Sequence, residues 1–172
     1  MADPPWPYGV RGAYSWRKHR PSGEARHLPY DTMTVEAIGA LPIGERAEDD
    51  AHLYLWTTNR FILDGYRVVS AWGFRPRQVL VWAKMPTGWG IGGAFSNSTE
   101  FVIFARRGRL PYKTRIPRDW WQWPRGQHSA KPEAFQDLVE RVSPGPYLEL
   151  FARRQRLGWD TWGNEALNHV TL

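Results

Sequence analysis

The tetrapeptide Asp3-Pro4-Pro5-Trp6 restricts the backbone more than any other stretch of this sequence. Each proline fixes its own φ angle and pushes the residue before it into an extended conformation, so neither Asp3 nor Pro4 can continue a helix. Trp6 adds a large flat ring directly after this stiff segment. The sequence therefore predicts a short, rigid loop that begins at Asp3.

A loop of this kind suits the methylation of an exocyclic amine on a nucleobase. The lone pair of that nitrogen is conjugated into the ring, so the amine is a poor nucleophile and its N–H groups need acceptors. We predict that the Asp3 carboxylate and the carbonyl of Pro4 or Pro5 supply them, and that Trp6 stacks on the base. The alternative is a turn after a strand, in which Trp6 covers an edge of the core.

Length and composition favour one domain that acts on a polyanion. A chain of 172 residues can bury roughly 70% of its unfolded surface, so we expect residues 1–172 to form a single domain. The net charge of +6 favours a nucleic-acid partner. The absence of cysteine excludes disulfides and is compatible with a reducing compartment. No long apolar run or signal peptide is visible, and we predict a cytoplasmic protein without membrane contact.

One stretch of the chain combines positive charge with aromatic rings. Six basic residues fall within a short segment, and aromatic residues interleave with or follow them: Arg106, Arg107, Arg109, Lys113, Arg115 and Arg118, with Tyr112, Trp120, Trp121 and Trp123. Charge together with stacking suits an unpaired nucleic-acid strand. A solvated loop explains the charges about equally well. The five histidines show no ligand spacing, and no metal site is predicted.

Apolar runs alternate with helical patterns along the chain. Strands are predicted at 52–57, 79–84, 100–105 and 147–152, with a fifth short strand at 159–162 for which an antiparallel direction is one option. Helices are predicted at 35–41, from 59 to 73 and from 132 to 142. The order strand, helix, strand predicts the α/β class with a mostly parallel sheet.

Six motifs in one order point to a known family. They are Asp3-Pro-Pro-Trp6, Leu28-Pro-Tyr30, Leu53-Tyr-Leu-Trp56, Ser129-x-Lys131-Pro132, Leu148-Glu-Leu-Phe-Ala-Arg153 and Trp162-Gly-Asn-Glu165. Together they closely resemble the MT-A70 family of adenine-N6 methyltransferases, over residues 3–167. That family includes the catalytic subunit of the eukaryotic messenger-RNA adenosine methyltransferase and small bacterial and phage DNA enzymes. The resemblance implies a Rossmann-like methyltransferase fold, a catalytic loop that precedes the cofactor-binding strand, and S-adenosylmethionine as methyl donor.

The resemblance also implies a role for each residue that matches a family motif. Asp3, Pro4, Pro5 and Trp6 correspond to the catalytic loop, and Tyr30 corresponds to a tyrosine beside the active site. The implied cofactor-binding residues are Lys131, Glu149, Phe151, Arg153, Asn164 and Glu165. Lys131 would meet the cofactor's carboxylate at a helix N-terminus. Without the family, Lys131 reads as a solvated side chain, and Asn164 with Glu165 reads as a polar turn.

The sequence departs from the family at its beginning. Family members usually have an apolar strand directly before the catalytic tetrapeptide, whereas here Met1 stands two residues before Asp3. Either the natural start lies upstream, or the domain lacks that strand and part of the cofactor pocket.

The substrate is predicted to be DNA, because Ala152-Arg153 and Gly158-Trp159 look more like the bacterial and phage members. RNA, the exocyclic amine of cytosine, and a nucleic-acid-binding subunit without catalysis are the alternatives. A homodimer or a partner subunit is left open.

Overall fold

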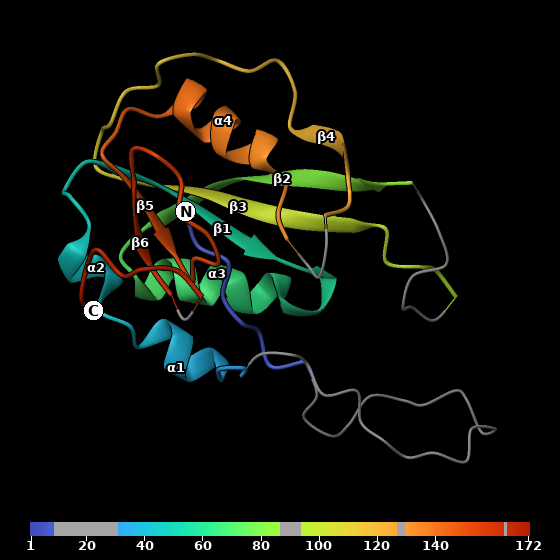
Figure 1. Ribbon diagram of the computed structural model, residues 1–172, viewed down its shortest axis with the longest axis horizontal. Coiled ribbons are helices and arrows are strands. Elements are labelled where there is room, and N and C mark those ends of the chain that lie inside the picture. Colours follow the sequence, from blue (N-terminus) through green and yellow to red (C-terminus); the bar gives the residue numbers. More distant parts are fainter. Residues whose placement is uncertain (9–30, 87–93, 127–129, 164) are drawn as a thin grey trace.

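The computed structural model describes residues 1–8, 31–86, 94–126, 130–163 and 165–172. Its strands are β1 (Ala51–Thr57), β2 (Arg75–Met85), β3 (Thr99–Arg107), β4 (Trp120–Pro124), β5 (Tyr147–Leu150) and β6 (Trp159–Trp162). Its helices are α1 (Val35–Gly39), α2 (Ile43–Arg46), α3 (Ile62–Ala71) and α4 (Glu133–Val142), with a 3₁₀ turn, η1, at Asn59–Phe61. Helices cover both faces of the sheet, α4 on one side and α3 on the other (Figure 1). The α/β class is confirmed.

The larger sheet has the strand order β1-β3-β2-β4 and is mixed. β3 runs antiparallel to both of its neighbours, β1 and β2, whereas β2 and β4 are parallel. The sequence predicted a mostly parallel sheet because β1 and β2 flank a helix. These two strands do run in the same direction, but β3 lies between them and reverses both pairings. A hydrophobic pattern shows that a strand exists and not which strand becomes its neighbour.

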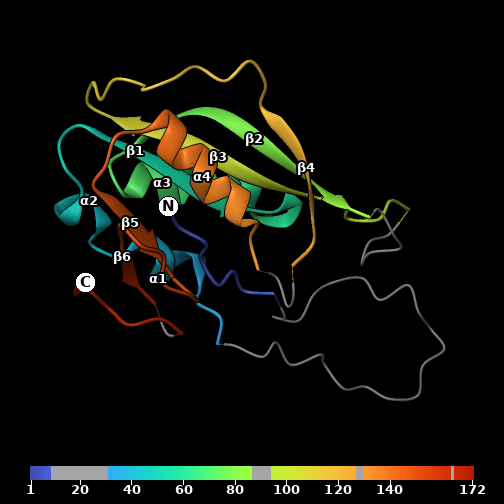
Figure 2. The same ribbon diagram turned by 45° about the horizontal axis from the view of Figure 1, so that its top comes forward.

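The short segment at residues 1–3 connects the two sheets. Ala2 forms parallel bridges to Leu55 in β1 and to Leu150 in β5. The Ala2 N–H donates to the Tyr54 carbonyl at 2.9 Å, and the Ala2 carbonyl accepts from the Trp56 N–H at 2.8 Å. β5 also pairs with β6 in parallel, so the antiparallel option for 159–162 is wrong. Figure 2 shows the N-terminal segment entering beside β5 and beneath α4.

Both faces of β1 are buried, and its side chains alternate between two cores. Leu53 and Leu55 point into a core formed with α1, α2 and α3, where Trp72 is fully buried. Tyr54 and Trp56 point into the other core, against Phe135 and its neighbours on α4. Burial on both sides explains why β1 is an almost continuous apolar run.

Two elements were not predicted from the sequence. β4 lies in the stretch interpreted as a basic, tryptophan-rich connection, and α2 spans one turn only. Trp121 and Trp123 are on one face of β4 and stack on each other at 5.5 Å between ring centroids. This alternation was hidden because a third tryptophan, Trp120, occupies the opposite, exposed face.

Gly163, which directly follows β6, is predicted to tolerate no side chain. A Cβ atom at this position would lie 2.4 Å from both the backbone nitrogen and the backbone oxygen of Ala152. Backbone atoms cannot move aside as a flexible side chain can. Gly163→Ala should therefore lower the free energy of unfolding by about 2 kcal/mol or more, measured by urea denaturation.

Gly39→Ala is the matched control, because a Cβ there meets only the Ala71 Cβ, at 3.8 Å. Alanine is also the better helix former, so this variant should be as stable as the parent or slightly more stable. Equal stability of the two variants would contradict the packing described around Gly163.

Candidate active site

Asp3 leaves the sheet at the carboxyl end of the short strand-like segment. The chain then turns tightly, because the Trp6 N–H donates to the Pro4 carbonyl at 2.8 Å. The Met33 N–H donates to the Pro5 carbonyl at 2.9 Å. Both proline carbonyls that were expected to be open acceptors are thus already engaged. A carbonyl oxygen has two lone pairs, so each retains capacity for one further donor.

Trp6 anchors the loop and is not presented to a ligand. Its side chain is 3% exposed, and its ring stacks on Phe61 with centroids 5.4 Å apart. Its indole N–H donates to the Trp56 carbonyl at 3.0 Å. In this conformation the predicted stacking of Trp6 on a base is replaced by stacking on the core. The reading of Trp6 as cover for a core edge fits these contacts.

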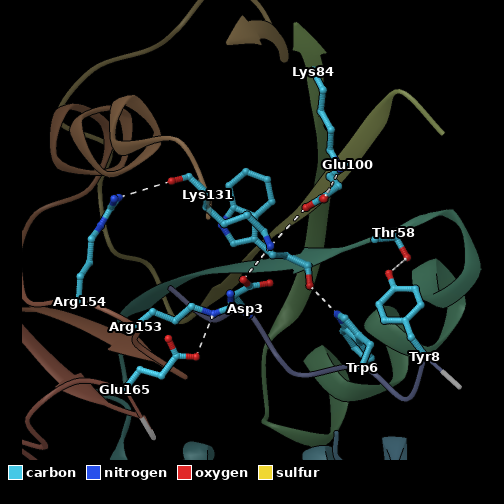
Figure 3. Close-up of polar contacts among 11 residues, drawn as sticks. Asp3, Trp6, Tyr8, Thr58, Lys84, Glu100, Lys131, Arg153, Arg154 and Glu165 are labelled. Atoms are coloured by element: carbon cyan, nitrogen blue, oxygen red, sulfur yellow. Dashed lines mark hydrogen bonds and ion pairs between the residues drawn. The ribbon is translucent and has the colours of Figure 1, made fainter. Parts of the chain in front are cut away.

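Four side chains of alternating charge form a continuous chain beside the loop (Figure 3). The Lys131 ammonium donates to the Asp3 carboxylate at 2.7 Å and lies 3.3 Å from the carboxylate of Glu100. The other carboxylate oxygen of Glu100 is paired with Lys84. The order is therefore Asp3, Lys131, Glu100, Lys84, and the formal charges cancel. All four side chains are largely buried, with 12–20% of their surface exposed.

The order of charges determines which acid holds its proton more firmly. Burial raises the pKa of Asp3 above its usual value, and Lys131 opposes but does not cancel this effect. Burial alone would also raise the pKa of Glu100, but Lys131 and Lys84 outweigh it and hold that pKa below its usual value. Glu100 lies between two cations, whereas Asp3 shares a single cation. Asp3 is therefore the weaker acid of the two.

Lys131 is held protonated at the start of α4. Burial would lower its pKa, but the two carboxylates, Asp3 and Glu100, together raise it above the usual value. The ammonium also lies over the Trp56 ring, 5.4 Å from the centroid. Lys131 immediately precedes Pro132, the N-cap residue of α4. Lys131 is thus a buried ammonium at a helix N-terminus, and the alternative of a solvated side chain does not fit this burial.

Four of the six predicted cofactor residues lie near Asp3, three of them at the carboxyl end of β5 and Lys131 at the start of α4. Asp3, Lys131, Glu149, Phe151 and Arg153 line one recess of about 50 Å³, together with Met1, Ala130, Pro132, Gln136 and Arg154. The Arg153 guanidinium lies 3.8 Å from the carboxylate of Glu165. In open α/β sheets ligands bind at such carboxyl ends. Tyr30 and Asn164, two further predicted residues, lie outside the described residues.

Phe151 has an unusual backbone conformation at this recess. Its φ angle is +61°, the left-handed region that side-chain-bearing residues rarely adopt. Such conformations cost on the order of 1–3 kcal/mol and cluster at functional sites. At Phe151 the backbone turns away from the direction of β5, which ends at Leu150, and continues to Arg153.

Glu149 has a hydrogen-bond partner that the sequence did not suggest. Its carboxylate accepts a hydrogen bond from Gln136 on α4 at 2.9 Å, and burial raises its pKa. Gln136 is 2% exposed and in turn accepts from Arg154 at 3.2 Å. Glu149 is therefore part of a hydrogen-bonded network that joins β5 to α4.

Sequence reasoning missed Glu100 and Lys84, which complete the charge chain. Both appeared only as ends of apolar strands, at residues 100–105 and 79–84. The sequence did contain a sign of their contact. Each is a single charge at the end of a buried strand, and the two strands are consecutive along the chain. Burial of a charge is expensive unless it is paired, so two such residues predict a mutual contact.

A buried carboxylate with a raised pKa, an adjacent ammonium and a strained turn at the carboxyl ends of strands are typical of an α/β enzyme that handles a polar ligand. The sequence profile of the MT-A70 family matches residues 1–165. The chain belongs to this family of methyltransferases.

Three relatives illustrate the range of the family. The Type II methyltransferase M.MunI of a Mycoplasma species is 34% identical over 177 residues, which cover 95% of this chain and 75% of that protein. A probable N(6)-adenosine-methyltransferase of Oryza sativa subsp. japonica is 28% identical, over all of this chain and 23% of its own length. The human N(6)-adenosine-methyltransferase catalytic subunit METTL3 is 27% identical, over 96% of this chain and 27% of its own length. This chain thus spans about a quarter of the plant and human relatives.

Two further findings concern the described parts of the chain. No helix there is long and apolar enough to cross a membrane. No group of three or more His, Cys, Asp or Glu side chains in the same parts is placed to hold a metal ion.

Glu100→Gln is predicted to lower the pKa of Asp3. The substitution removes a negative charge that raises this pKa, and it leaves Lys131 to pair with Asp3 alone. The carboxyl ¹³C shift of Asp3, followed through a pH titration, measures the effect without an assay. Glu36→Gln, on the distant α1, is the control and should leave the titration unchanged. A pKa of Asp3 that rises or stays constant in Glu100→Gln would show that the two carboxylates do not compete for Lys131.

Proposed function

We propose that this protein transfers a methyl group from S-adenosylmethionine to the N6 amine of adenine in DNA. The observation that carries the proposal is the Asp3 carboxylate, held by Lys131 at the carboxyl ends of the strands. Family membership and the adenosine methyltransferases among the relatives support adenine N6 methylation. We further propose that residues 1–172 act as one Rossmann-like methyltransferase domain.

The polar groups at the recess fit S-adenosylmethionine, a ligand with one carboxylate, one ammonium and a ribose. Lys131 would hold the carboxylate, and the strained turn at Phe151 with Arg153 would lie at the adenosine. Glu149 and Glu165 would accept hydrogen bonds from ammonium or hydroxyl groups. The recess of about 50 Å³ is much smaller than the 300–1,000 Å³ of typical ligand pockets, so it represents one corner of the site. When bound, the cofactor supplies an electrophilic methyl group.

Asp3 would act on the amine and not on the cofactor. Its carboxylate accepts an N–H of the adenine amine, which orients the nitrogen and increases its electron density. The free lone pair of the Pro4 or Pro5 carbonyl would accept the second N–H. The methylated nitrogen must lose a proton, and a carboxylate whose pKa burial has raised accepts a proton more readily than an ordinary one. Fixed geometry would supply much of the acceleration.

The remaining residues of the charge chain position Asp3. Lys131 holds one carboxylate oxygen, which fixes the direction of the other. Glu100 and Lys84 hold Lys131 from the opposite side. Trp6 keeps the loop on the core through Phe61 and the Trp56 carbonyl. Trp6 is thus proposed as a positioning residue of the loop.

DNA is favoured over RNA because identity to the Type II methyltransferase, at 34%, exceeds identity to the plant and human adenosine methyltransferases, at 28% and 27%. RNA adenosine methylation is the second candidate. A nucleic-acid-binding subunit without catalysis would have no need for a buried, correctly paired Asp3. We further propose a cytoplasmic location and S-adenosylmethionine as the donor.

Asp3→Asn should strongly slow methyl transfer while the fold is kept. The amide is nearly isosteric but lacks the charge, so the rate should fall by on the order of 10²–10³. The assay uses labelled S-adenosylmethionine with unmethylated DNA and, in parallel, RNA, and identifies the methylated nucleoside by mass spectrometry. N6-methyladenine in DNA is the expected product.

Asp49→Asn serves as the control for this variant, because the Asp49 side chain is fully exposed on a distant turn. Product from Asp3→Asn at the parent rate would refute the catalytic assignment, methylcytosine would change the substrate, and product on RNA alone would change the polymer.

A further inference from the structure

A second feature lies on the α4 side of the sheet, away from Asp3. The connection between β3 and β4, residues 108–119, passes outside α4 (Figure 1). This connection carries four basic side chains, Arg109, Lys113, Arg115 and Arg118, and a single acidic one, Asp119. The Asp119 carboxylate accepts a hydrogen bond from Gln78. The charge of this connection is therefore strongly positive.

A recess of about 230 Å³ opens between this connection, α4 and the sheet. Its apolar wall includes Leu80, Phe104, Trp121 and Leu138. Arg115 and Arg118 also line it, and both side chains are exposed to solvent. We call this feature the arginine recess. It is distinct from the recess at Asp3, with which it shares no lining residue.

The connection is anchored to the body of the protein and is not merely a solvated loop. The Lys113 N–H donates to the Val142 carbonyl at 2.8 Å, and the Asp119 carbonyl accepts from the Val81 N–H at 2.8 Å. Arg106 donates to the Leu110 carbonyl at 2.6 Å and lies over the Tyr112 ring. His52 packs against the same tyrosine ring, 5.2 Å between centroids. The path that carries the two arginines is thus fixed at both ends.

The two arginines of the recess differ from the arginines that already have an anionic partner. Arg107, Arg154 and Arg156 each form an ion pair with a carboxylate. Within the described residues Arg115 and Arg118 form no salt bridge, so both remain available to an anion from outside. Two guanidinium groups without a carboxylate partner, carried on an anchored segment beside an apolar wall, match a phosphodiester strand, whose phosphates are anionic and whose sugars and bases are largely apolar at their faces.

We propose that the arginine recess binds the phosphodiester backbone of the nucleic-acid substrate at a point remote from the methylated base. The inference rests on the proposed function for the identity of the polymer. Phosphates bind Arg115 and Arg118, and the sugar of the bound strand lies against the apolar wall. Such contacts give affinity and register without reading the sequence.

The spacing between the charge chain and the arginine recess sets the length of nucleic acid that can reach both. Lys84 of the charge chain and Gln78 of the arginine recess lie on the same strand, β2, six residues apart. At about 3.3 Å per residue this is roughly 20 Å, or about six nucleotide steps of 3.4 Å. A duplex of 24 base pairs therefore covers both places with several pairs to spare.

The test compares the parent protein with the double variant Arg115→Ala/Arg118→Ala. Binding to a fluorescent 24-base-pair DNA duplex is measured by anisotropy over a range of salt concentrations. Each lost phosphate contact should reduce the slope of log affinity against log salt by about one, so the double variant should lose about two. Affinity near 0.1 M salt should fall roughly tenfold or more. Single-stranded DNA and RNA of the same length show which polymer the recess prefers.

Arg67→Ala is the matched control, because Arg67 is exposed on α3, on the opposite face of the sheet. It should keep the parent slope and affinity, and all variants should keep the parent melting temperature. In methyl transfer the double variant should keep kcat and raise KM. A double variant that binds with the parent slope and affinity would overturn the proposal.

Failure of the two proposals can be told apart. If the variant loses binding and the parent protein methylates no polymer, the recess stands and the enzymatic assignment fails. If methylation proceeds and the variant binds and reacts as the parent does, the recess proposal fails alone.

Discussion

The backbone hydrogen bonds of Ala2 are the constraint on which the rest of the molecule depends. Ala2 is 0% exposed and is bridged to β1 on one side and to β5 on the other. Among the described residues, this segment supplies the bridges that join the two sheets. The residue that follows it, Asp3, therefore leaves the sheet at a fixed place, beside the carboxyl end of β5. A stiff Pro-Pro pair and the buried Trp6 then prevent the loop from drifting.

The buried charge chain is the electrostatic counterpart of that backbone constraint. A carboxylate at 19% exposure needs a cation, and Lys131 provides it from the start of α4. Lys131 in turn is shared with Glu100, which keeps the Asp3 carboxylate incompletely compensated. The pair therefore links the two layers of the fold and holds at the same time an acid with a raised pKa. The packing of α4 against the N-terminal segment and the protonation of Asp3 both depend on the Lys131–Asp3 contact of 2.7 Å.

Much of the fold and part of the candidate site could be predicted from the sequence. Apolar runs and helix starts located five strands and the longer helices, because both faces of strands such as β1 are buried and leave a clear pattern. Strand neighbours could not be predicted, since the position of β3 between β1 and β2 is a tertiary choice. The tight loop at Asp3 was foreseeable from its prolines. The burial of Trp6 was not, because a tryptophan can equally cover a core or a ligand.

The missing members of the site have a similar cause. Lys131 and Asp3 are separated by 128 residues, and only the family resemblance suggested that both belong to one site. Glu100 and Lys84 belong to no motif that was recognised, yet the antiparallel pairing of β2 and β3 brings them together. The sequence pattern shows that Lys84 and Glu100 are charged residues in buried strands, but the pairing of the strands decides that they contact each other.

The most direct test of this account is the affinity of S-adenosylhomocysteine, which retains the cofactor's carboxylate, for the parent protein and for Lys131→Met, measured by calorimetry. Lys113→Met, at an exposed lysine outside the charge chain and outside the recess at Asp3, is the control. If Lys131 is the cation shared between Asp3 and the cofactor, Lys131→Met should bind at least about tenfold more weakly, and Lys113→Met should change little. Equal affinity of the folded Lys131→Met protein and the parent would contradict the assignment of this corner as the place where cofactor and catalytic loop meet.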